Sequence, residues 1–475
     1  MINNKIVDNL ILFFLSILVI IFLSYDSHKL GFFADDISII GDLSKINDIT
    51  QLREFNLNFD AGRELQPLWM LIFIKISSFI KIEFLHLIQI IIYLINSYLL
   101  FLILKSLDIN KKNSVILTFY FLLFPLYSEV IFWAHNISMT LTSSMFFLIF
   151  FYLNIIQYKK HKTILKNEFY IILFSILSIF TYEQYIYAIF LIILLRIFLK
   201  KKLALNKKDK LILLVHTAIV VIFSLYKLSE IKDLAVAYNS SLLQFIMNII
   251  ISLLVPIKTV FLSDYSIRSF TPTIFIIIIF GIMSMYYFLK NNEYKIKENK
   301  KLRNNIFIKI ILCFMLYLLA LIPIYFHHIS PRHFYLPSIF IIITAGICLN
   351  HNSLEKKIFK IKLSKYAYLL IILSIMSNAL NLNYVKYSQV ANYIMKKNFY
   401  EEIIKKFDNR GDVSLINFPL TYKKAPLFAH EQSNVIKFIF KDNNLPSISI
   451  KTLQKNKIKF IDIENNKIIY EIISN

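Results

Sequence analysis

The chain has 475 residues, of which 57% are hydrophobic and 17% charged, and only 6 are glycine. Apolar runs of about 18 to 22 residues recur along it, which is the length that the hydrocarbon core of a bilayer demands. The net charge of +23 does not indicate nucleic-acid binding, because the basic residues sit in short loops between apolar runs. Cys313 and Cys348 lie inside apolar runs without CxxC spacing, which argues against a disulfide framework or a metal site. The composition predicts a polytopic α-helical membrane protein.

The apolar runs predict about eleven transmembrane helices. The expected spans are 8–25, 84–104, 114–133, 138–157, 168–181, 184–199, 211–228, 272–289, 306–325, 337–350 and 366–383. Two further stretches, 67–80 and 241–256, are expected to be interfacial or re-entrant helices, because a crossing at 241–256 would move the basic loop 290–303 to the outer side. Lys5 precedes the first apolar run, which lacks a cleavage site and predicts a retained helix.

Loop charge predicts which side of the membrane each connection faces. Lys-rich connections occur at 105–112, 157–166, 196–210, 290–303 and 351–365. Because Lys and Arg are retained on the cytoplasmic side, these connections should lie inside, with the N-terminus inside and the C-terminus outside. The loop 26–83 should lie outside, and 26–66 within it contains more acidic than basic residues. We expect residues 1–383 to form one transmembrane module.

Residues 384–475 differ in composition from the rest of the chain, with shorter apolar runs and more charged and Asn residues. The segment 387–407 has helical spacing of apolar residues, and 412–419 is typical of a buried strand. The segment 458–472 has two apolar runs separated by Asn-Asn, which predicts a hairpin. This region is expected to be a small soluble extracytoplasmic domain of the α/β or α+β class.

Ionisable residues at the ends of apolar runs are the candidates for function, because inserting a charge costs roughly 2.5–3.5 kcal/mol. These residues are Asp35, Asp36, Arg63, Glu129, His135, Glu183, Asp264, Arg268, His328 and Arg332. With the predicted topology all of them lie on the outer side. We expect them to line one cavity there.

Structural roles are also open at these positions. Asp35 and Asp36 would then form a solvated turn, although Phe and Ile residues flank them. Arg63 would extend to the lipid head groups. Asp264 and Arg268, four residues apart, would pair with each other.

The other candidates have their own structural alternatives. Glu129 and Glu183 lie in apolar sequence, so each would pair with a buried Arg. His135, His327 and His328 would be polar caps at helix ends, since no H-x-x-H or H-x-x-x-H spacing occurs. No metal site is predicted from the histidines.

Several short motifs resemble a known family of membrane enzymes. "FFADD" at 32–36 and "GRELQP" at 62–67 resemble the GT-C superfamily of glycosyltransferases, which use polyprenyl-phosphate sugars. Further elements resemble, in the same order, the protein O-mannosyltransferase-like branch: "FPLYSEV" at 124–130, "TYEQ" at 181–184, "LSDYSI" at 262–267, "PRHFYLPS" at 331–338 and "INFP" at 416–419. The resemblance extends from residue 32 to about 420 and implies a GT-C-like fold.

The resemblance implies an inverting glycosyltransferase of the cell envelope, in the cytoplasmic membrane of a bacterium. It would move a sugar from a polyprenyl-phosphate donor to a surface glycan, lipid or protein on the outer face. Asp35 would be the general base and Asp36 would orient the acceptor or the base. Arg63 and Arg332 would bind the donor phosphate, because a guanidinium matches its geometry. No cofactor is implied, and two aspartates without further acidic ligands predict no tight divalent site.

Three other functions remain open. A transporter or flippase of lipid-linked precursors would use the carboxylates as a proton relay, but usually shows paired halves and helices broken by Gly or Pro. A polysaccharide polymerase or ligase would be expected to have large outer loops rich in Arg and His, whereas the first loop here is acidic. A scaffold would have no reason to gather ionisable groups on one apolar edge.

Overall fold

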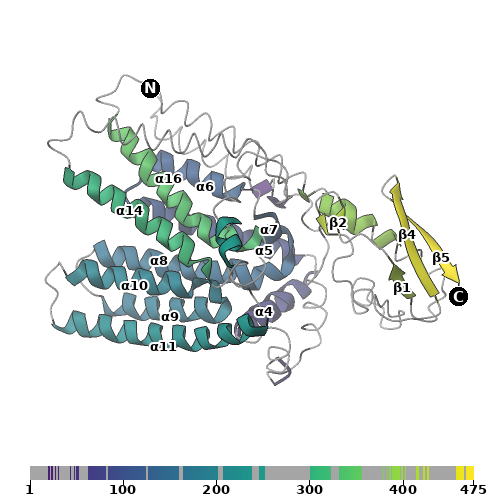
Figure 1. Cartoon of the computed structure of the whole chain (residues 1–475), viewed down its shortest axis with the longest axis horizontal. Coiled ribbons are helices and arrows are strands. Elements are labelled where there is room, and N and C mark those ends of the chain that lie inside the picture. Colours follow the sequence, from purple (N-terminus) through teal and green to yellow (C-terminus); the bar gives the residue numbers. More distant parts are fainter. Residues whose placement is uncertain are drawn as a thin grey trace.

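Figure 1 shows the computed structural model, in which helices form a bundle and strands lie near the C-terminus. The structure describes residues 63–81, 84–124, 127–159, 164–201, 207–237, 245–251, 300–322, 331–355, 413–416, 421–422, 425–426, 456–464 and 467–474, with short pieces between 20 and 52 and between 378 and 402. The expected span 272–289 and most of 8–25 and 366–383 lie outside the described residues.

Three helical segments are long and apolar enough to cross a membrane. They are α5 (Leu85–Ser106), the continuous segment Ala134–Lys159, and Arg332–Leu349. Shorter apolar helices occur at Asn113–Leu122, Lys210–Tyr226 and Ile308–Leu319. The chain is therefore helical, with helices able to span a bilayer by length and composition. The count of eleven spans stays a prediction.

The helices pack side by side along their length. Besides α5 they are α4 (Gln66–Ser78), α6 (Lys111–Leu122), α7 (Ser128–Phe132), α8 (Ser143–Lys159), α9 (Leu165–Thr181), α10 (Ile186–Lys201), α11 (Lys207–Ala237), α14 (Lys300–Leu319) and α16 (Tyr335–Glu355). Short turns join them: the 3₁₀ turns η4 (Ala134–Ile137), η6 (Glu183–Tyr185) and η8 (Pro331–Phe334), and the π turn η5 (Ser138–Thr142). Helix α8 packs against α5 and α9, α11 against α9 and α10, and α14 against α16 (Figure 1).

The expected span 114–133 is wrong as a single helix. Helix α6 ends at Leu122 and the short α7 begins only at Ser128. The sequence has Pro125 between them, and a proline lacks the backbone N–H and disfavours helix at the residue before it. The hydroxyl of Tyr93 donates to the carbonyl oxygens of Phe121 and Leu122 at 3.0 and 2.9 Å, which satisfies the end of α6.

Buried aromatic rings join α5, α6 and α16. The ring centroid of Tyr335 lies 5.8 Å from Tyr93, 5.2 Å from Phe121 and 5.0 Å from Tyr127. All four side chains are nearly inaccessible to solvent. Because aromatic pairs contribute about 0.5–1.5 kcal/mol each beyond their area, this group fixes the contact between the three helices.

Gly346 marks the closest approach of α16 to the start of α6. A Cβ atom there would lie 2.6 Å from Cδ1 of Ile109 and 3.1 Å from Cδ1 of Leu117. We expect Gly346→Val to lower the free energy of unfolding by about 1–3 kcal/mol through overpacking, measured as thermal unfolding in detergent. Ile341 lies on the same helix and is 40% exposed. Ile341→Val is therefore the control and should change the free energy of unfolding little. Equal effects of both substitutions would contradict the close contact.

Within the described residues, strands occur only after residue 412. A three-stranded sheet has the order β1-β4-β5, formed by β1 (Val413–Ile416), β4 (Asn456–Glu464) and β5 (Lys467–Ser474), and β2 (Thr421–Tyr422) pairs with β3 (Ala425–Pro426). Strand β1 is parallel to β4, and β5 is antiparallel to it. The predicted strand within 412–419 and the predicted hairpin are confirmed. That these residues form a separate domain outside the membrane stays a prediction.

Candidate functional site

Arg63 and Glu183 form a two-pronged ion pair at one end of the bundle. Nε of Arg63 donates to Oε2 of Glu183 at 2.8 Å, and Nη2 donates to Oε1 at 2.8 Å. The guanidinium carbon also lies 5.1 Å from the ring centroid of Tyr182, and Nη1 contacts Sδ of Met139 at 3.6 Å. The side chains of Arg63 and Glu183 are 24% and 15% exposed. The structural alternative that Glu183 pairs with an Arg is therefore confirmed.

The backbone holds the two partners of this pair in place. Arg63 precedes α4, and Glu183 follows the end of α9. The backbone N–H of Leu65 donates to the carbonyl oxygen of Phe180 at 3.1 Å, and Nε1 of Trp69 donates to Oγ1 of Thr181 at 3.2 Å. The start of α4 is thus fixed to the last turn of α9 by two hydrogen bonds next to the ion pair.

Arg332 contacts a histidine rather than a carboxylate. Its Nη1 donates to Nε2 of His135 at 3.1 Å. Because a guanidinium only donates hydrogen bonds, Nε2 is the acceptor, and this tautomer carries its proton on Nδ1. Nε of Arg332 is buried without a hydrogen-bond partner, and no carboxylate among the described residues pairs with this side chain. Arg332 is therefore a cation whose Nε–H donor is not used in a hydrogen bond.

The two arginines belong to one group. Nε2 of Gln184, the residue after Glu183, donates to the carbonyl oxygen of His333, the residue after Arg332, at 2.6 Å. This bond ties η6 to η8. We call Arg63, His135, Glu183 and Arg332 the arginine cluster.

The turns η4 and η5 carry the side chains that contact the two arginines, His135 in the 3₁₀ turn η4 and Met139 in the π turn η5. In η5 the hydroxyl of Thr142 donates to the carbonyl oxygen of Ile137 five residues earlier at 2.7 Å. Nδ2 of Asn96 on α5 donates to the carbonyl oxygen of Leu141 at 3.0 Å. Side chains therefore satisfy carbonyl groups that a π turn leaves unused, and such turns are frequent at functional sites. This turn links the histidine of η4 to the methionine of η5.

Glu129 lies in α7 beside η4. Its carbonyl oxygen accepts from Nδ2 of Asn136 at 3.0 Å. Nε2 of Gln89 on α5 donates to the carbonyl oxygens of Val130 and Trp133 at 2.7 Å each. Helix α7, which contacts η4 and η8, is thus anchored next to the arginine cluster.

The remaining predicted site residues cannot be placed. Asp35, Asp36, Asp264, Arg268 and His328 lie outside the described residues. In the part of the chain that is described, no three His, Cys, Asp or Glu side chains lie together as a metal site would require. That the reaction needs no divalent metal stays a prediction.

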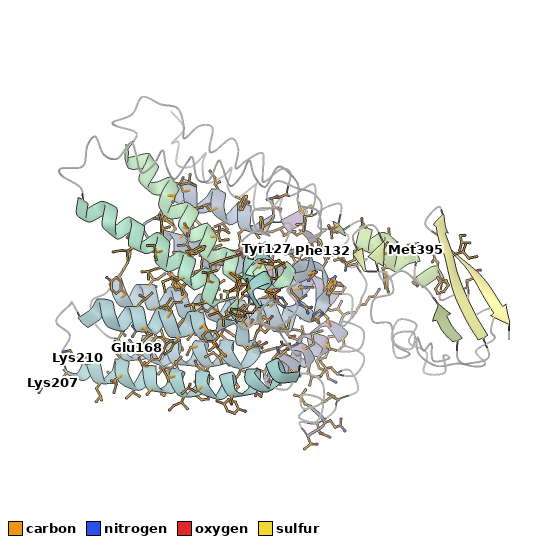
Figure 2. The ribbon with its side chains drawn as sticks, in the orientation of Figure 1. Tyr127, Phe132, Glu168, Lys207, Lys210 and Met395 are labelled. Atoms are coloured by element: carbon orange, nitrogen blue, oxygen red, sulfur yellow. The ribbon has the colours of Figure 1, made fainter. Side chains whose placement is uncertain are left out.

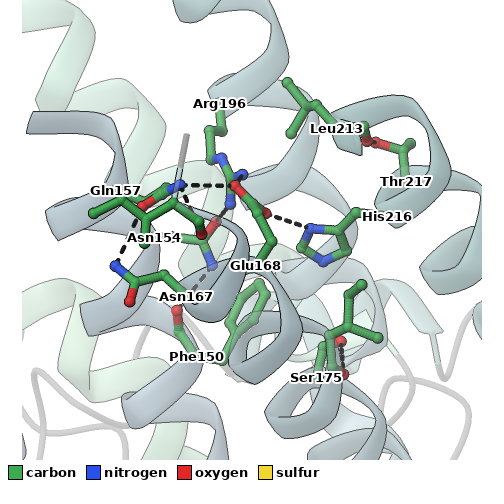
Figure 3. Close-up of polar contacts among 12 residues, drawn as sticks. Phe150, Asn154, Gln157, Asn167, Glu168, Ser175, Arg196, Leu213, His216 and Thr217 are labelled. Atoms are coloured by element: carbon green, nitrogen blue, oxygen red, sulfur yellow. Dashed lines mark hydrogen bonds and ion pairs between the residues drawn. The ribbon is translucent and has the colours of Figure 1, made fainter. Parts of the chain in front are cut away.

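A second polar group, which the sequence did not predict, lies inside the bundle (Figure 3). Glu168 on α9 accepts hydrogen bonds from Nη2 of Arg196 on α10, from Nδ1 of His216 on α11 at 3.2 Å and from Nε2 of Gln157 on α8 at 3.1 Å. Nη1 of Arg196 also donates to Oδ1 of Asn154 at 2.8 Å. We call Glu168, Arg196 and His216 the buried triad, since their side chains are 3%, 3% and 0% exposed.

The buried triad lies away from the arginine cluster along the helices. Figure 2 shows Glu168 toward the end of the bundle that carries Lys207 and Lys210, whereas Phe132 lies toward the end nearer the strands. Glu168 is in the first turn of α9, whereas Glu183 comes two residues after its last residue, Thr181, which lies about 20 Å from Glu168 along the helix axis. In the sequence, the triad could have been recognised from its three ionisable residues, which lie about one turn inside the ends of apolar runs.

Comparison with known proteins gives no family assignment. No family model and no curated protein matches the chain. The resemblance to the GT-C superfamily therefore rests on the motifs in the sequence and stays a prediction.

Proposed function

We propose that the chain is an inverting membrane glycosyltransferase that transfers a sugar from a polyprenyl-phosphate donor to an acceptor hydroxyl. The observation that carries this proposal is Arg332, whose guanidinium is partly buried, lacks a carboxylate partner among the described residues and keeps an unused donor at Nε. A cation in this state favours an anionic ligand, and a lipid phosphate presents matching oxygens at a membrane surface.

The arginine cluster supports different roles for its two arginines. Glu183 already occupies Nε and Nη2 of Arg63 and balances its charge. We propose that Arg63 positions the start of α4 beside the site and that Arg332 binds the leaving phosphate. Nε2 of His135 accepts from Nη1 of Arg332 and so helps to hold this guanidinium in place.

The chemistry is a single displacement. The acceptor oxygen forms a bond to the anomeric carbon while the bond from that carbon to the phosphate oxygen breaks, which inverts the anomeric centre. Asp35 takes the proton of the acceptor hydroxyl, and Asp36 orients the acceptor or the base. Arg332 stabilises the charge that develops on the leaving polyprenyl phosphate.

The proposed topology places this reaction on the outer face of a bacterial cytoplasmic membrane. It has eleven crossings and an extracytoplasmic domain at 384–475. Lys207 and Lys210 belong to a Lys-rich connection and lie toward the end of the bundle where Glu168 is found. That arrangement supports a cytoplasmic position for this end and an outer position for the arginine cluster.

The test measures sugar transfer in membranes that contain the protein, supplied with radiolabelled polyprenyl-phosphate hexoses and pentoses. Arg332→Gln should raise the donor concentration needed for half-maximal transfer by about 10- to 100-fold, because charge-assisted hydrogen bonds contribute about 1.5–3 kcal/mol. Lys105→Gln, at the exposed far end of α5, is the control for loss of one positive charge. An unchanged donor dependence in Arg332→Gln would remove Arg332 from the site.

The buried triad favours a second candidate function, transport of a lipid-linked precursor coupled to protons. A carboxylate hydrogen-bonded to an imidazole inside a helix bundle is the kind of group that relays protons in membrane transporters. However, Arg196 balances the charge of Glu168, and three side chains donate to its carboxylate. Flipping of a labelled lipid-linked sugar in proteoliposomes, lost in His216→Gln, would favour transport over transfer.

A further inference from the structure

Strand β5 is an edge strand of the three-stranded sheet that the described residues form. The strand order is β1-β4-β5, and β5 lies outermost in Figure 1. Among the described residues, no strand pairs with its outer side. The sequence of β5, KIIYEIIS, is apolar apart from Lys467, Glu471 and Ser474 and contains no proline. An apolar edge strand of this length is a template for pairing with a further strand.

The register of the hairpin determines which backbone groups face outward. Two residues separate β4 from β5, and Glu464 lies opposite Lys467. In such a hairpin the closing pair exchanges its backbone hydrogen bonds, and the pattern alternates along β5, because the register shift between Phe460 and Asp462 adds its extra residue to β4. Positions 467, 469 and 471 therefore direct their N–H and C=O groups to β4. Positions 468, 470 and 472 direct theirs outward, where a second antiparallel strand would accept them.

Charge identifies the partner that fits this edge. In the register of the hairpin Glu464 is the partner of Lys467 and Lys459 is the partner of Glu471, so residues of opposite charge are paired along the sheet. We propose that β5 pairs with β5 of a second copy of this chain, antiparallel, about a twofold axis at Ile469. That register sets Lys467 of each copy opposite Glu471 of the other. A line drawn across the four strands then passes residues of alternating charge. It runs from Glu464 to Lys467 in one copy and continues to Glu471 and Lys459 of the second copy.

The apolar centre of the interface fits the same register. Ile469 is 37% exposed in the single chain and would meet its own equivalent on the twofold axis. Positions 467, 469 and 471 lie on one face of the strand, because side chains alternate in direction. Two opposite-charge pairs therefore flank one Ile–Ile pair, and cross-strand pairs of both kinds stabilise an antiparallel sheet. Moving the register by one pair would set Glu471 opposite Ile469 and lose both charge pairs.

Disulfide cross-linking in membranes tests the proposal on the full chain. The chain has 2 cysteines, so Cys313→Ser with Cys348→Ser gives a cysteine-free background. Residues at a non-hydrogen-bonded antiparallel pair have Cα atoms about 4.5 Å apart, which a disulfide can bridge. Ile469→Cys should therefore form a dimer under mild oxidation that a reductant reverses. Ile461→Cys is the matched control, since Ile461 is 56% exposed but lies on the central strand.

Charge reversal tests the register. In the Ile469→Cys background, Lys467→Glu should reduce the cross-linked fraction by about fivefold, because it sets like charges opposite each other twice across the interface and once within each hairpin, at Glu464. Adding Glu471→Lys should restore cross-linking, and this rescue separates lost pairing from lost folding. The proposal is overturned if Ile469→Cys stays monomeric, or if Ile461→Cys cross-links equally well. It is also overturned if cross-linking occurs only through Tyr470→Cys, or if the product contains a different protein.

Discussion

Glu168→Gln should lower the free energy of unfolding by about 3–5 kcal/mol, the largest stability effect that the structure leads us to expect. The substitution removes the charge that balances Arg196 while both side chains are only 3% exposed. It leaves a guanidinium among helices α8 to α11 without a carboxylate. Unfolding in mixed detergent micelles with increasing denaturant would measure the change.

Two further variants separate the buried charge from other effects. Asp108→Asn breaks the ion pair between Asp108 and Lys159, whose side chains are 81% and 43% exposed, respectively. It should lower the free energy of unfolding by at most about 1 kcal/mol. Asparagine also tolerates the positive φ of 63° at residue 108. Glu168→Leu combined with Arg196→Leu should recover much of the loss, because no uncompensated charge then remains. A Glu168→Gln variant as stable as Asp108→Asn would show that the triad is not a buried charge pair.

Asp35→Asn should reduce sugar transfer by about 10²–10⁴-fold at saturating donor, with little change in the donor concentration needed for half-maximal rate. An amide cannot accept the proton of the acceptor hydroxyl, whereas donor binding depends on Arg332. The combination of a lost rate and unchanged donor dependence distinguishes a base from a phosphate ligand. Initial rates in membranes with equal amounts of inserted protein would give both values.

Asp48→Asn is a matched control in the same predicted outer loop. Oδ1 of Asp48 accepts hydrogen bonds from the hydroxyl of Thr50 at 2.5 Å and from the backbone N–H of Gln51 at 2.8 Å. These hydrogen bonds lower the pKa of Asp48 below its ordinary value, so this carboxylate is a local cap rather than a base. Full transfer activity in Asp35→Asn, or equal losses in Asp35→Asn and Asp48→Asn, would contradict the assignment.

The sequence predicted those helices whose position follows from the length of an apolar run alone. The run 84–104 is α5, and the run 138–157 lies within the helical segment Ala134–Lys159. It also predicted the β4–β5 hairpin, because two apolar runs around Asn-Asn have few alternatives. Hydropathy failed at 114–133, where Pro125 interrupts a run that is predominantly apolar. Backbone chemistry, not polarity, ends α6 there.

The pairings within the site could not be predicted. Arg63, Glu183, His135 and Arg332 could be recognised as candidates because burying an ionisable side chain near an apolar run is costly. However, 120 residues separate Arg63 from Glu183, and 197 separate His135 from Arg332. Which partners meet depends on how α4, α9 and α16 pack. The buried triad was missed because the candidates were taken from the predicted outer side, whereas Glu168, Arg196 and His216 lie near the Lys-rich connections.

The π turn Ser138–Thr142 makes the arginine cluster depend on the number of residues as well as on their chemistry. It holds one residue more than an α-helical turn. Deleting a single residue there would let a regular helix close, and each residue of an α-helix turns the chain by about 100°. His135 would then rotate away from Arg332 relative to α8, although every side chain in the cluster was kept. A one-residue deletion is therefore a more severe change at this point than many substitutions.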